Sequence, residues 1–465
     1  MLTAIIASVM LAIVPVRYSS PVDYDITLAG NFGEPRPYHF HGGLDIKTDN
    51  VEGKHVRSIA DGYVSRITVG LYGFGNAVYV THPEGYTSVY AHLKRFSPRL
   101  EKHITRPNGR DTIDIHFTPL DFPVSQGQLI AISGNTGHST GPHLHLEIHD
   151  TQTWNMLDPL DFIGHLISDS VAPRAHSIMA CPLAGHGTFC GTSSIQTFPC
   201  DRINADSTET STLLTAWGRV GFALWADDYM QGVHNYYGIR QTILLVDGHE
   251  VFRSDVDRIP TNDNRQVNAW GDFSHWRRNR TWYMRSFILP GVTLPMLHAD
   301  SNRGYVDFHE ERPYRLEYYL RDYFGNESHY AFTVVGKREN IAMAKATAQP
   351  YCCGSAVFCD RLTTVSMPGM TLVIPPRMVA VNTAIHTTAE KGLLSPRYCF
   401  SSEPLPLFGC GELSIALRQE VADPSLLYIE CDGHDIGGRY SNGWISTPIR
   451  ELSAHYEIKQ RTKAN

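Results

Sequence analysis

Short runs of β-branched and aromatic residues, separated by glycine-containing turns, are the feature that most constrains how this chain can fold. Five such runs lie between residues 63 and 149: Tyr63–Val69, Asn76–His82, Thr87–Leu93, Gln128–Ser133 and His143–His149. Runs of this length, bounded by Gly, Pro, Asn and Ser, favour strands over helices. The pattern predicts a mainly β fold in which the first three runs form an antiparallel meander joined by tight turns.

Similar runs recur beyond residue 200, and they predict more β structure: Val220–Trp225, Gln241–Val246, Trp282–Leu289, Tyr314–Leu320 and Tyr330–Val335. The segment Asp322–Asn326, which reads DYFGN, predicts a hairpin turn before the last of them. We expect an immunoglobulin-like β-sandwich here, with an insertion at Asn262–Arg280. A further β-rich region is expected from about residue 350.

The length of 465 residues is too great for one hydrophobic core, so about two to four domains are expected. Hydrophobic residues make up 42% and charged residues 19%, which is typical of a globular chain. We predict a signal peptide at 1–20, a first domain at 21–172, the sandwich at 173–338 and a second β-rich accessory domain at 349–465. A helix-favouring link at 339–348 joins the last two.

The N-terminal residues 2–16 read LTAIIASVMLAIVPV, an apolar run too short to span a bilayer comfortably. It is typical of the apolar core of a signal peptide, although no Lys or Arg precedes it. The run therefore favours export to the periplasm or cell envelope, with no stable membrane span after removal of the signal. A buried N-terminal strand and an uncleaved anchor are the alternatives.

The net charge bears on the kind of partner, and the cysteines bear on whether a second metal site is present. The net charge is −7 and no long basic run occurs, so nothing favours a nucleic-acid partner. All nine cysteines follow residue 180. Cys352, Cys353 and Cys359 lie close together in the chain, but no matching Cys/His set stands nearby, which favours buried or disulfide-bonded cysteines over a metal site.

Three histidine-containing segments carry the strongest chemical signal. They read FHGGLDI at 40–46, YAHL at 90–93 and GPHLHLE at 141–147. With 23 histidines in the chain, a single His-x-His motif is weak evidence, and His39 with His41 forms a second one. The ordered set of three segments, each in a strand or glycine-turn context, is far more specific.

The chemistry of this set fits zinc. Side chains alternate along a strand, so His143 and His145 point to one face while Leu144 points into the core. We expect the two glycines after His41 to allow that histidine and Asp45 to converge on the same ion. Two histidines and one carboxylate leave a fourth tetrahedral position for water, as in catalytic rather than structural zinc sites.

These segments resemble the lysostaphin/LytM-type zinc endopeptidases of bacterial cell walls, and the layout resembles the multi-domain forms of Bacteroides-group bacteria. The resemblance covers roughly residues 21–165. It implies a small antiparallel β-sheet or barrel-like domain with a groove across the sheet. It also implies one Zn²⁺ held by His41, Asp45 and His145, with His143 activating water and His92 stabilising the tetrahedral intermediate.

The activity implied by the resemblance is hydrolysis of peptide bonds in peptidoglycan. We expect the later domains to offer contacts for an envelope protein. The alternatives are a non-catalytic peptide-binding or hydrolase-activating module and an exported protease that cuts proteins. Two features stay open. Arg95–Phe122 is longer than the resemblance implies and either walls the groove or is an inert insertion. Glu147 either orients a metal ligand or is an ordinary solvated carboxylate.

Overall fold

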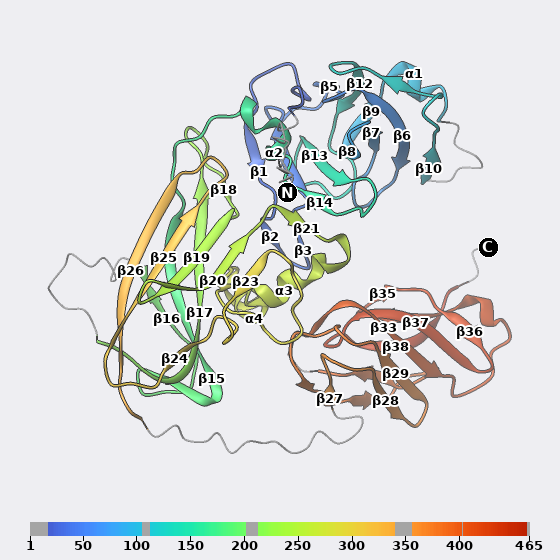
Figure 1. The fold of residues 1–465 in the computed structure, drawn as a ribbon. Coiled ribbons are helices and arrows are strands. Elements are labelled where there is room, and N and C mark those ends of the chain that lie inside the picture. The colour runs from blue at the N-terminus through green and yellow to red at the C-terminus, as the bar shows by residue number, and fades with distance from the viewer. Residues whose placement is uncertain (1–16, 105–111, 201–212, 340–355, 402, 463–465) are drawn as a thin grey trace, which may run out of the picture. The chain divides into compact units, whose positions relative to one another are not determined.

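The computed structural model describes residues 17–104, 112–200, 213–339, 356–401 and 403–462 (Figure 1). Most of the predicted signal peptide, nearly all of the predicted link at 339–348, and Cys352 and Cys353 lie outside the described residues. The chain divides into two compact units. The first contains the described residues up to Phe32 together with Gly42–Asp169, and the second contains Gly33–His41 and the chain from Ser170 onward.

The first unit is built on one antiparallel sheet. Its strands follow the order β1 (Leu28–Gly30), β4 (Gly43–Lys47), β13 (His143–Asp150), β8 (Tyr86–Ala91), β7 (Ala77–Thr81), β6 (Gly62–Val69) and β10 (Ile113–His116). A smaller sheet has the order β5 (His55–Arg57), β12 (Leu129–Ser133) and β9 (Leu93–Phe96). The remaining elements are short: β11 (Pro123–Val124), β14 (Met156–Leu157), α1 (Pro98–Glu101), α2 (Leu160–Ile163) and η2 (Gly164–Leu166).

The predicted strands of this unit are confirmed to within one or two residues at each end. Strands β6, β7 and β8 pair successively and antiparallel, as the meander requires. Strand β13 lies between β4 and β8, and its residues Leu144, Leu146 and Ile148 are fully buried. Because side chains alternate along a strand, the other face of β13 is left for its polar residues.

The described part of Arg95–Phe122 is more regular than expected. Strand β10 pairs with β6 at the edge of the sheet opposite to β4, and the ring of His103 packs edge-on against Phe122 at 4.7 Å. His116 lies beside Asp114 on the same strand. This segment therefore extends the sheet on the side away from β4 and β13, and neither of its histidines belongs to the group described below.

The second unit begins with a sheet of long strands. Its order is β16 (Gln196–Pro199), β15 (Arg174–Phe189), β17 (Leu214–Tyr229), β26 (Glu327–Gly336), β25 (Pro313–Arg321), β19 (Gln241–Val246), β20 (His249–Asp255) and β23 (Leu297–Ala299). Three short strands also pair with β17: β18 (Tyr236–Tyr237), β22 (Met284–Arg285) and β24 (Val306–Phe308). The pair β17 and β26 is parallel. An immunoglobulin-like arrangement of these strands remains a prediction.

Two predictions for this region are tested directly. The turn at Asp322–Asn326 joins β25 to β26, where the Asp322 amide donates to the Asn326 carbonyl. The predicted strand Trp282–Leu289 is wrong, because only β22 forms within it. The Trp282 ring stacks on that of Trp276 at 5.5 Å, so this part of the segment packs against the helices instead of continuing a strand.

The predicted insertion Asn262–Arg280 is largely helical. It contains η4 (Thr261–Gln266), α3 (Val267–Trp270) and α4 (Phe273–Asn279), and it follows the short strand β21 (Arg258–Ile259). Asp272 caps α4, since its carboxylate accepts a hydrogen bond from the His275 amide at 2.8 Å. The same unit contains the hairpin formed by β2 (Pro35–Arg36) and β3 (His39–Phe40).

The C-terminal part of this unit is a pair of five-stranded sheets. One has the order β28 (Thr363–Met367), β29 (Met370–Ile374), β33 (Pro406–Ala416), β37 (Trp444–Glu451) and β36 (Arg439–Ser441). The other has the order β31 (Thr388–Glu390), β32 (Arg397–Cys399), β38 (Tyr456–Gln460), β34 (Leu427–Cys431) and β35 (His434–Asp435). Strands β27 (Ala356–Val357) and β30 (Thr383–Ala384) and the helix η5 (Pro424–Leu426) complete it. Both sheets contribute fully buried side chains to one core, among them Leu413 and Ile458.

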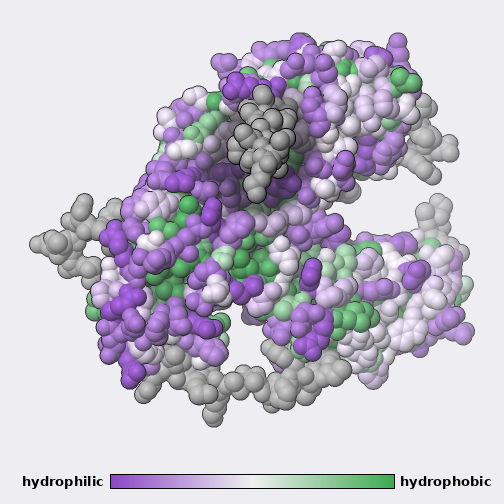
Figure 2. Space-filling model, viewed as in Figure 1, coloured by the Kyte–Doolittle hydropathy of each residue, from purple (hydrophilic) through white to green (hydrophobic). Residues whose placement is uncertain are grey.

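The surface in Figure 2 is mostly hydrophilic, with apolar residues in separate patches. Within the described ranges, no helix has the length and apolar character needed to cross a membrane.

Candidate metal centre

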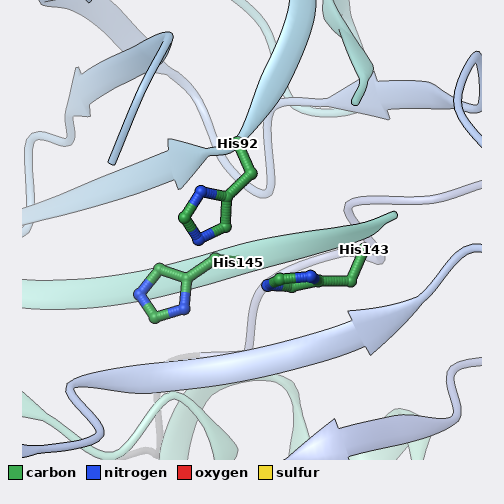
Figure 3. Close-up of side chains that lie close together, drawn as sticks. All are labelled: His92, His143 and His145. Carbon is green, nitrogen blue, oxygen red and sulfur yellow. The ribbon is translucent and has the colours of Figure 1, made fainter. Parts of the chain in front are cut away.

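Strand β13 is the element on which the polar site of the first unit is built. His145 lies directly opposite Asp45 of β4 on one side and Ala91 of β8 on the other. Directly opposed residues in an antiparallel pair share a face, with Cβ atoms about 5 Å apart. His143 is two residues away on the same face, and Figure 3 shows the rings of His143, His145 and His92 lying close together.

His145 is held between two carboxylates. Its Nδ1 donates to Asp45 Oδ1 at 2.8 Å, and its Nε2 donates to Glu147 Oε1 at 2.9 Å. All three residues are buried, with 5 to 7% of their surface exposed. Buried charges of this kind are stable only when they are paired and hydrogen-bonded, and both conditions are met here.

Glu147 is itself fixed by a second histidine. His149 Nε2 donates to Glu147 Oε2 at 2.6 Å, so each carboxylate oxygen has a ring donor. The His149 ring stacks on Trp154 at a centroid distance of 4.4 Å, and its Nδ1 lies 3.3 Å from the Trp154 carbonyl oxygen. Glu147 is therefore a buried partner of His145, not a solvated carboxylate.

His143 and His92 are oriented in the same way. The Nδ1 of His143 donates to the Gly141 carbonyl at 2.8 Å, and the Nδ1 of His92 donates to the Thr136 carbonyl at 2.8 Å. Because a carbonyl oxygen can only accept, the proton of each neutral ring resides on Nδ1, which leaves Nε2 as the acceptor. His143 Nε2 lies 3.3 Å from Asp45 Oδ1, and the two ring centroids are 4.8 Å apart.

His92 occupies a special backbone position. It follows the last residue of β8 with a φ of +58°, in the left-handed region that few non-glycine residues adopt. Its amide donates to the Phe74 carbonyl at 2.9 Å, which holds this conformation. The break in the strand directs the His92 ring toward His143 and His145 instead of continuing the alternation of β8.

The pKa values follow from this environment. Burial opposes charge on His145, but its hydrogen bonds to Asp45 and Glu147 outweigh burial and raise its pKa to about 9. Burial likewise opposes charge on Glu147, yet the hydrogen bonds from His145 and His149 hold the pKa of this carboxyl far below its usual range. Burial, reinforced by the neighbouring rings of His145 and His143, lowers the pKa of His92 to about 4.

Two overlapping groups of residues offer metal ligands. In one, the ligand atoms of His92, His143 and His145 all lie within 4.8 Å of one another; in the other, those of His41, Asp45 and His145 do so. The second group is the predicted ligand set, and all three residues are buried. Two imidazoles and one carboxylate suit zinc. The ring of His145 lies between the carboxylates of Asp45 and Glu147.

The glycines after His41 serve a purpose different from the expected one. Neither Gly42 nor Gly43 has a positive φ. Instead they allow close approach: a Cβ on Gly43 would lie 2.2 Å from the Leu146 carbonyl oxygen, and one on Gly42 would lie 2.6 Å from Glu147 Oε1. Glycine is thus required because β13 and Glu147 pack directly against this backbone.

The three sequence motifs contain every residue of the two ligand groups, but His149 was not singled out from the sequence. His149 continues the same face of β13, and the strand alternation that linked His143 to His145 would have reached it. His39, which forms the second His-x-His motif with His41, is exposed and is absent from both groups of ligand residues.

Comparison with known proteins gives matches in two regions. Residues 39–107 match the model of peptidase family M23, a range that contains His41, Asp45 and His92. Residues 355–460 match the model of a Zu5-like domain.

Three curated proteins are similar to part of this chain. An uncharacterized metalloprotease of Haemophilus influenzae is 33% identical over 117 residues, covering 25% of this chain and 19% of its own length. The DD-carboxypeptidase/endopeptidase Mpg of Neisseria meningitidis is 33% identical over 111 residues, covering 24% and 20%. Lysostaphin of Staphylococcus staphylolyticus is 26% identical over 135 residues, covering 28% and 24%.

The chain spans about a fifth to a quarter of the length of these curated relatives. Each of these matches covers about a quarter of this chain. The segment at residues 39–107, which contains His41, Asp45 and His92, belongs to a peptidase family M23 domain.

Proposed function

We propose that this protein is a zinc-dependent endopeptidase that hydrolyses peptide bonds in bacterial cell-wall peptidoglycan. The observation that carries the proposal is the largely buried group around β13, in which a set of three histidines and a set of two histidines and one Asp share His145 within a peptidase family M23 domain. The names of two relatives, a DD-carboxypeptidase/endopeptidase and a peptidoglycan DD-endopeptidase of Vibrio cholerae, support a peptidase reaction on peptidoglycan.

We assign His41, Asp45 and His145 as the residues that hold one zinc ion. When bound, zinc polarises a carbonyl group and lowers the pKa of a coordinated water to about 7. Asp45 and His145 face each other across two paired strands, and Glu147 fixes the ring of His145 from the other side. A carboxylate on the outer nitrogen of a metal-binding histidine orients the ring and makes it a better ligand.

We assign His143 as the group that takes the proton of the attacking water and passes it to the leaving amine. Its Nδ1–H is committed to the Gly141 carbonyl, so Nε2 is the nitrogen that exchanges the proton. We assign His92 as the residue that stabilises the negative charge developing on the carbonyl oxygen of the cleaved peptide bond. One condition follows from its hydrogen bond to Thr136: His92 can donate through Nε2 only after it gains a second proton, because Nδ1–H is already in use.

The setting of the reaction is also a proposal. Peptidoglycan lies outside the cytoplasm, so we propose that the enzyme acts in the periplasm or cell envelope, after export by the signal peptide expected at the N-terminus. The β-rich domains that follow the peptidase domain would contact wall or an envelope protein.

The test is digestion of isolated peptidoglycan by the purified, zinc-loaded protein. New amine ends and altered muropeptides should appear with the wild type, vanish on chelation and return with zinc. His143→Ala should keep the zinc and lose the cleavage, whereas Asp45→Ala should lose both. An exposed histidine of the same domain, changed in His116→Ala, serves as the matched control.

The outcomes separate the alternatives. Stoichiometric zinc without cleavage would favour a peptide-binding module, and cleavage of denatured protein but not of peptidoglycan would favour a protease of another substrate class. A wild-type protein that binds no zinc would contradict the proposal outright.

A further inference from the structure

The hairpin that carries His41 is the starting point. We define the ligand hairpin as residues 33–41, in which β2 and β3 pair through Pro35 with Phe40 and Arg36 with His39. His41 closes it at the base: its amide donates to the Glu34 carbonyl at 2.9 Å, and its carbonyl accepts from the Gly33 amide at 2.8 Å. The backbone of His41 is therefore positioned by this hairpin.

Two side-chain amides of the helical insertion hold the ligand hairpin. The Tyr38 amide donates to Asn268 Oδ1 at 3.0 Å, and the Phe40 amide donates to Asn264 Oδ1 at 2.6 Å. Asn264 and Asn268 are four residues apart in the helical run η4–α3, a spacing that puts both side chains on one face. Each oxygen satisfies a backbone N–H of the hairpin.

Aromatic contacts with the same insertion surround these hydrogen bonds. The Tyr38 ring packs edge-on against Phe273 at 5.3 Å and lies under the Arg265 guanidinium at 5.1 Å. Phe40 is fully buried, and its ring lies 5.8 Å from that of Trp270. Both side chains that flank the hairpin tip are thus enclosed by residues 265–273.

The insertion is in turn tied to its own sheet. Trp270 Nε1 donates to the Arg285 carbonyl at 2.9 Å, and the Arg285 guanidinium pairs with Asp272 at 3.0 Å. Arg285 belongs to β22, which pairs with β17. The ligand hairpin is therefore anchored through α3 to the long strands that follow the peptidase domain in sequence.

We propose that Asn264 and Asn268 are positioning residues for the zinc ligand His41: by holding the ligand hairpin through the Tyr38 and Phe40 amides, they fix the backbone from which His41 projects. This inference rests on the proposed function only through the assignment of His41 as a zinc ligand. Outer partners that fix a ligand typically contribute about 10- to 100-fold to metal affinity.

The experiment uses the full-length protein and measures zinc affinity by competition with a fluorescent chelator. The double variant Asn264→Ala/Asn268→Ala should bind zinc about 10- to 100-fold more weakly than the wild type. Asn264→Asp/Asn268→Asp keeps an acceptor oxygen at each position and should restore most of the affinity. Asn262→Ala, at an exposed asparagine of the same helical run, is the matched control and should bind as the wild type does.

A purely structural role would give a different result. It would lower the midpoint of thermal unfolding in the alanine variant while the folded protein bound zinc within twofold of the wild-type affinity, and this result would overturn the inference. A wild type that binds no zinc would refute the proposed function.

A second measurement on the metal-free protein tests the anchoring without zinc. Amide hydrogen exchange of the peptide covering residues 33–41 should be slow in the wild type and at least about 10-fold faster in the alanine variant, because the Tyr38 and Phe40 amides lose their acceptors. Equal exchange in the two proteins would overturn the inference even if neither binds metal.

Discussion

Raising the pH of the metal-free protein from 6.5 to 9 should remove about 3 kcal/mol from its free energy of unfolding, through His145. The hydrogen bonds of this ring to Asp45 and Glu147 outweigh burial and raise its pKa from 6.5 to about 9. The difference of 2.5 between these two values, at about 1.36 kcal/mol per pH unit, gives the expected loss.

The direction of the effect follows from proton binding. Between pH 6.5 and 9 the folded protein holds a proton on His145 that the unfolded chain releases, so the stabilisation is complete below 6.5 and disappears as the pH rises through 9. The low pKa of Glu147 arises from its hydrogen bonds with His145 and His149, and the His145 hydrogen bond is counted only once. Glu147→Gln removes the negative charge but keeps the shape, so the fall should shrink to about half, since Asp45 remains.

The assay is urea unfolding of the chelator-treated protein at pH 6.5 and 9, with wild type, Glu147→Gln and Glu101→Gln compared. Glu101 is an exposed carboxylate of the same domain and should leave the pH dependence unchanged. A wild-type stability that is flat across this range, or an equal fall in Glu147→Gln, would refute the idea that His145 is a cation held between two carboxylates.

Three further predictions follow from the same group. Zinc binding at pH 7 should release about one proton, because His145 must lose a proton to become a ligand. Calorimetry in buffers of different ionisation enthalpy measures the number of protons released, and a value of zero would contradict the His145 pKa of about 9. His92→Ala should lower kcat by about 10²- to 10⁴-fold at unchanged zinc content. In the metal-free wild type, the lowered pKa of His92 should make the free energy of unfolding rise between pH 4 and 6.5, and His92→Ala should lack this rise. Gly43→Ala should destabilise the protein by about 1–3 kcal/mol or more and abolish zinc binding, because the new Cβ meets the Leu146 carbonyl at 2.2 Å. Thermal unfolding and chelator competition measure the two effects, and the control Gly70→Ala, whose Cβ has no contact under 3.8 Å, should show neither.

Local pattern was sufficient to predict the strands of the first domain. Periodicity of two and glycine turns are properties of a few consecutive residues, and β6, β7, β8, β12 and β13 form where they occur. The same reasoning failed at Trp282–Leu289, where the Trp282 ring packs on Phe273 and Trp276 of the insertion. Nothing in that segment alone distinguishes packing on the insertion from pairing as a strand.

The centre itself was predictable only in part. Alternation along β13 put His143 and His145 on one face, but the choice between a buried and a solvated Glu147 depends on His149 and on the packing around Trp154. The hydrogen bond from Tyr38 to Asn268 joins residues 230 positions apart, so no local pattern contains it.

The burial of Glu147 explains how the ring of His145 is held in one orientation. A buried carboxylate is costly unless both oxygens are satisfied, and here each receives a ring N–H, one from His145 and one from His149. The His149 ring is fixed in turn by stacking on Trp154. This chain of contacts leaves His145 a single orientation, with Nδ1 toward Asp45. His145 would therefore hold a cation without a change of ring orientation, and a fixed ligand ring is the condition for a site that binds metal tightly.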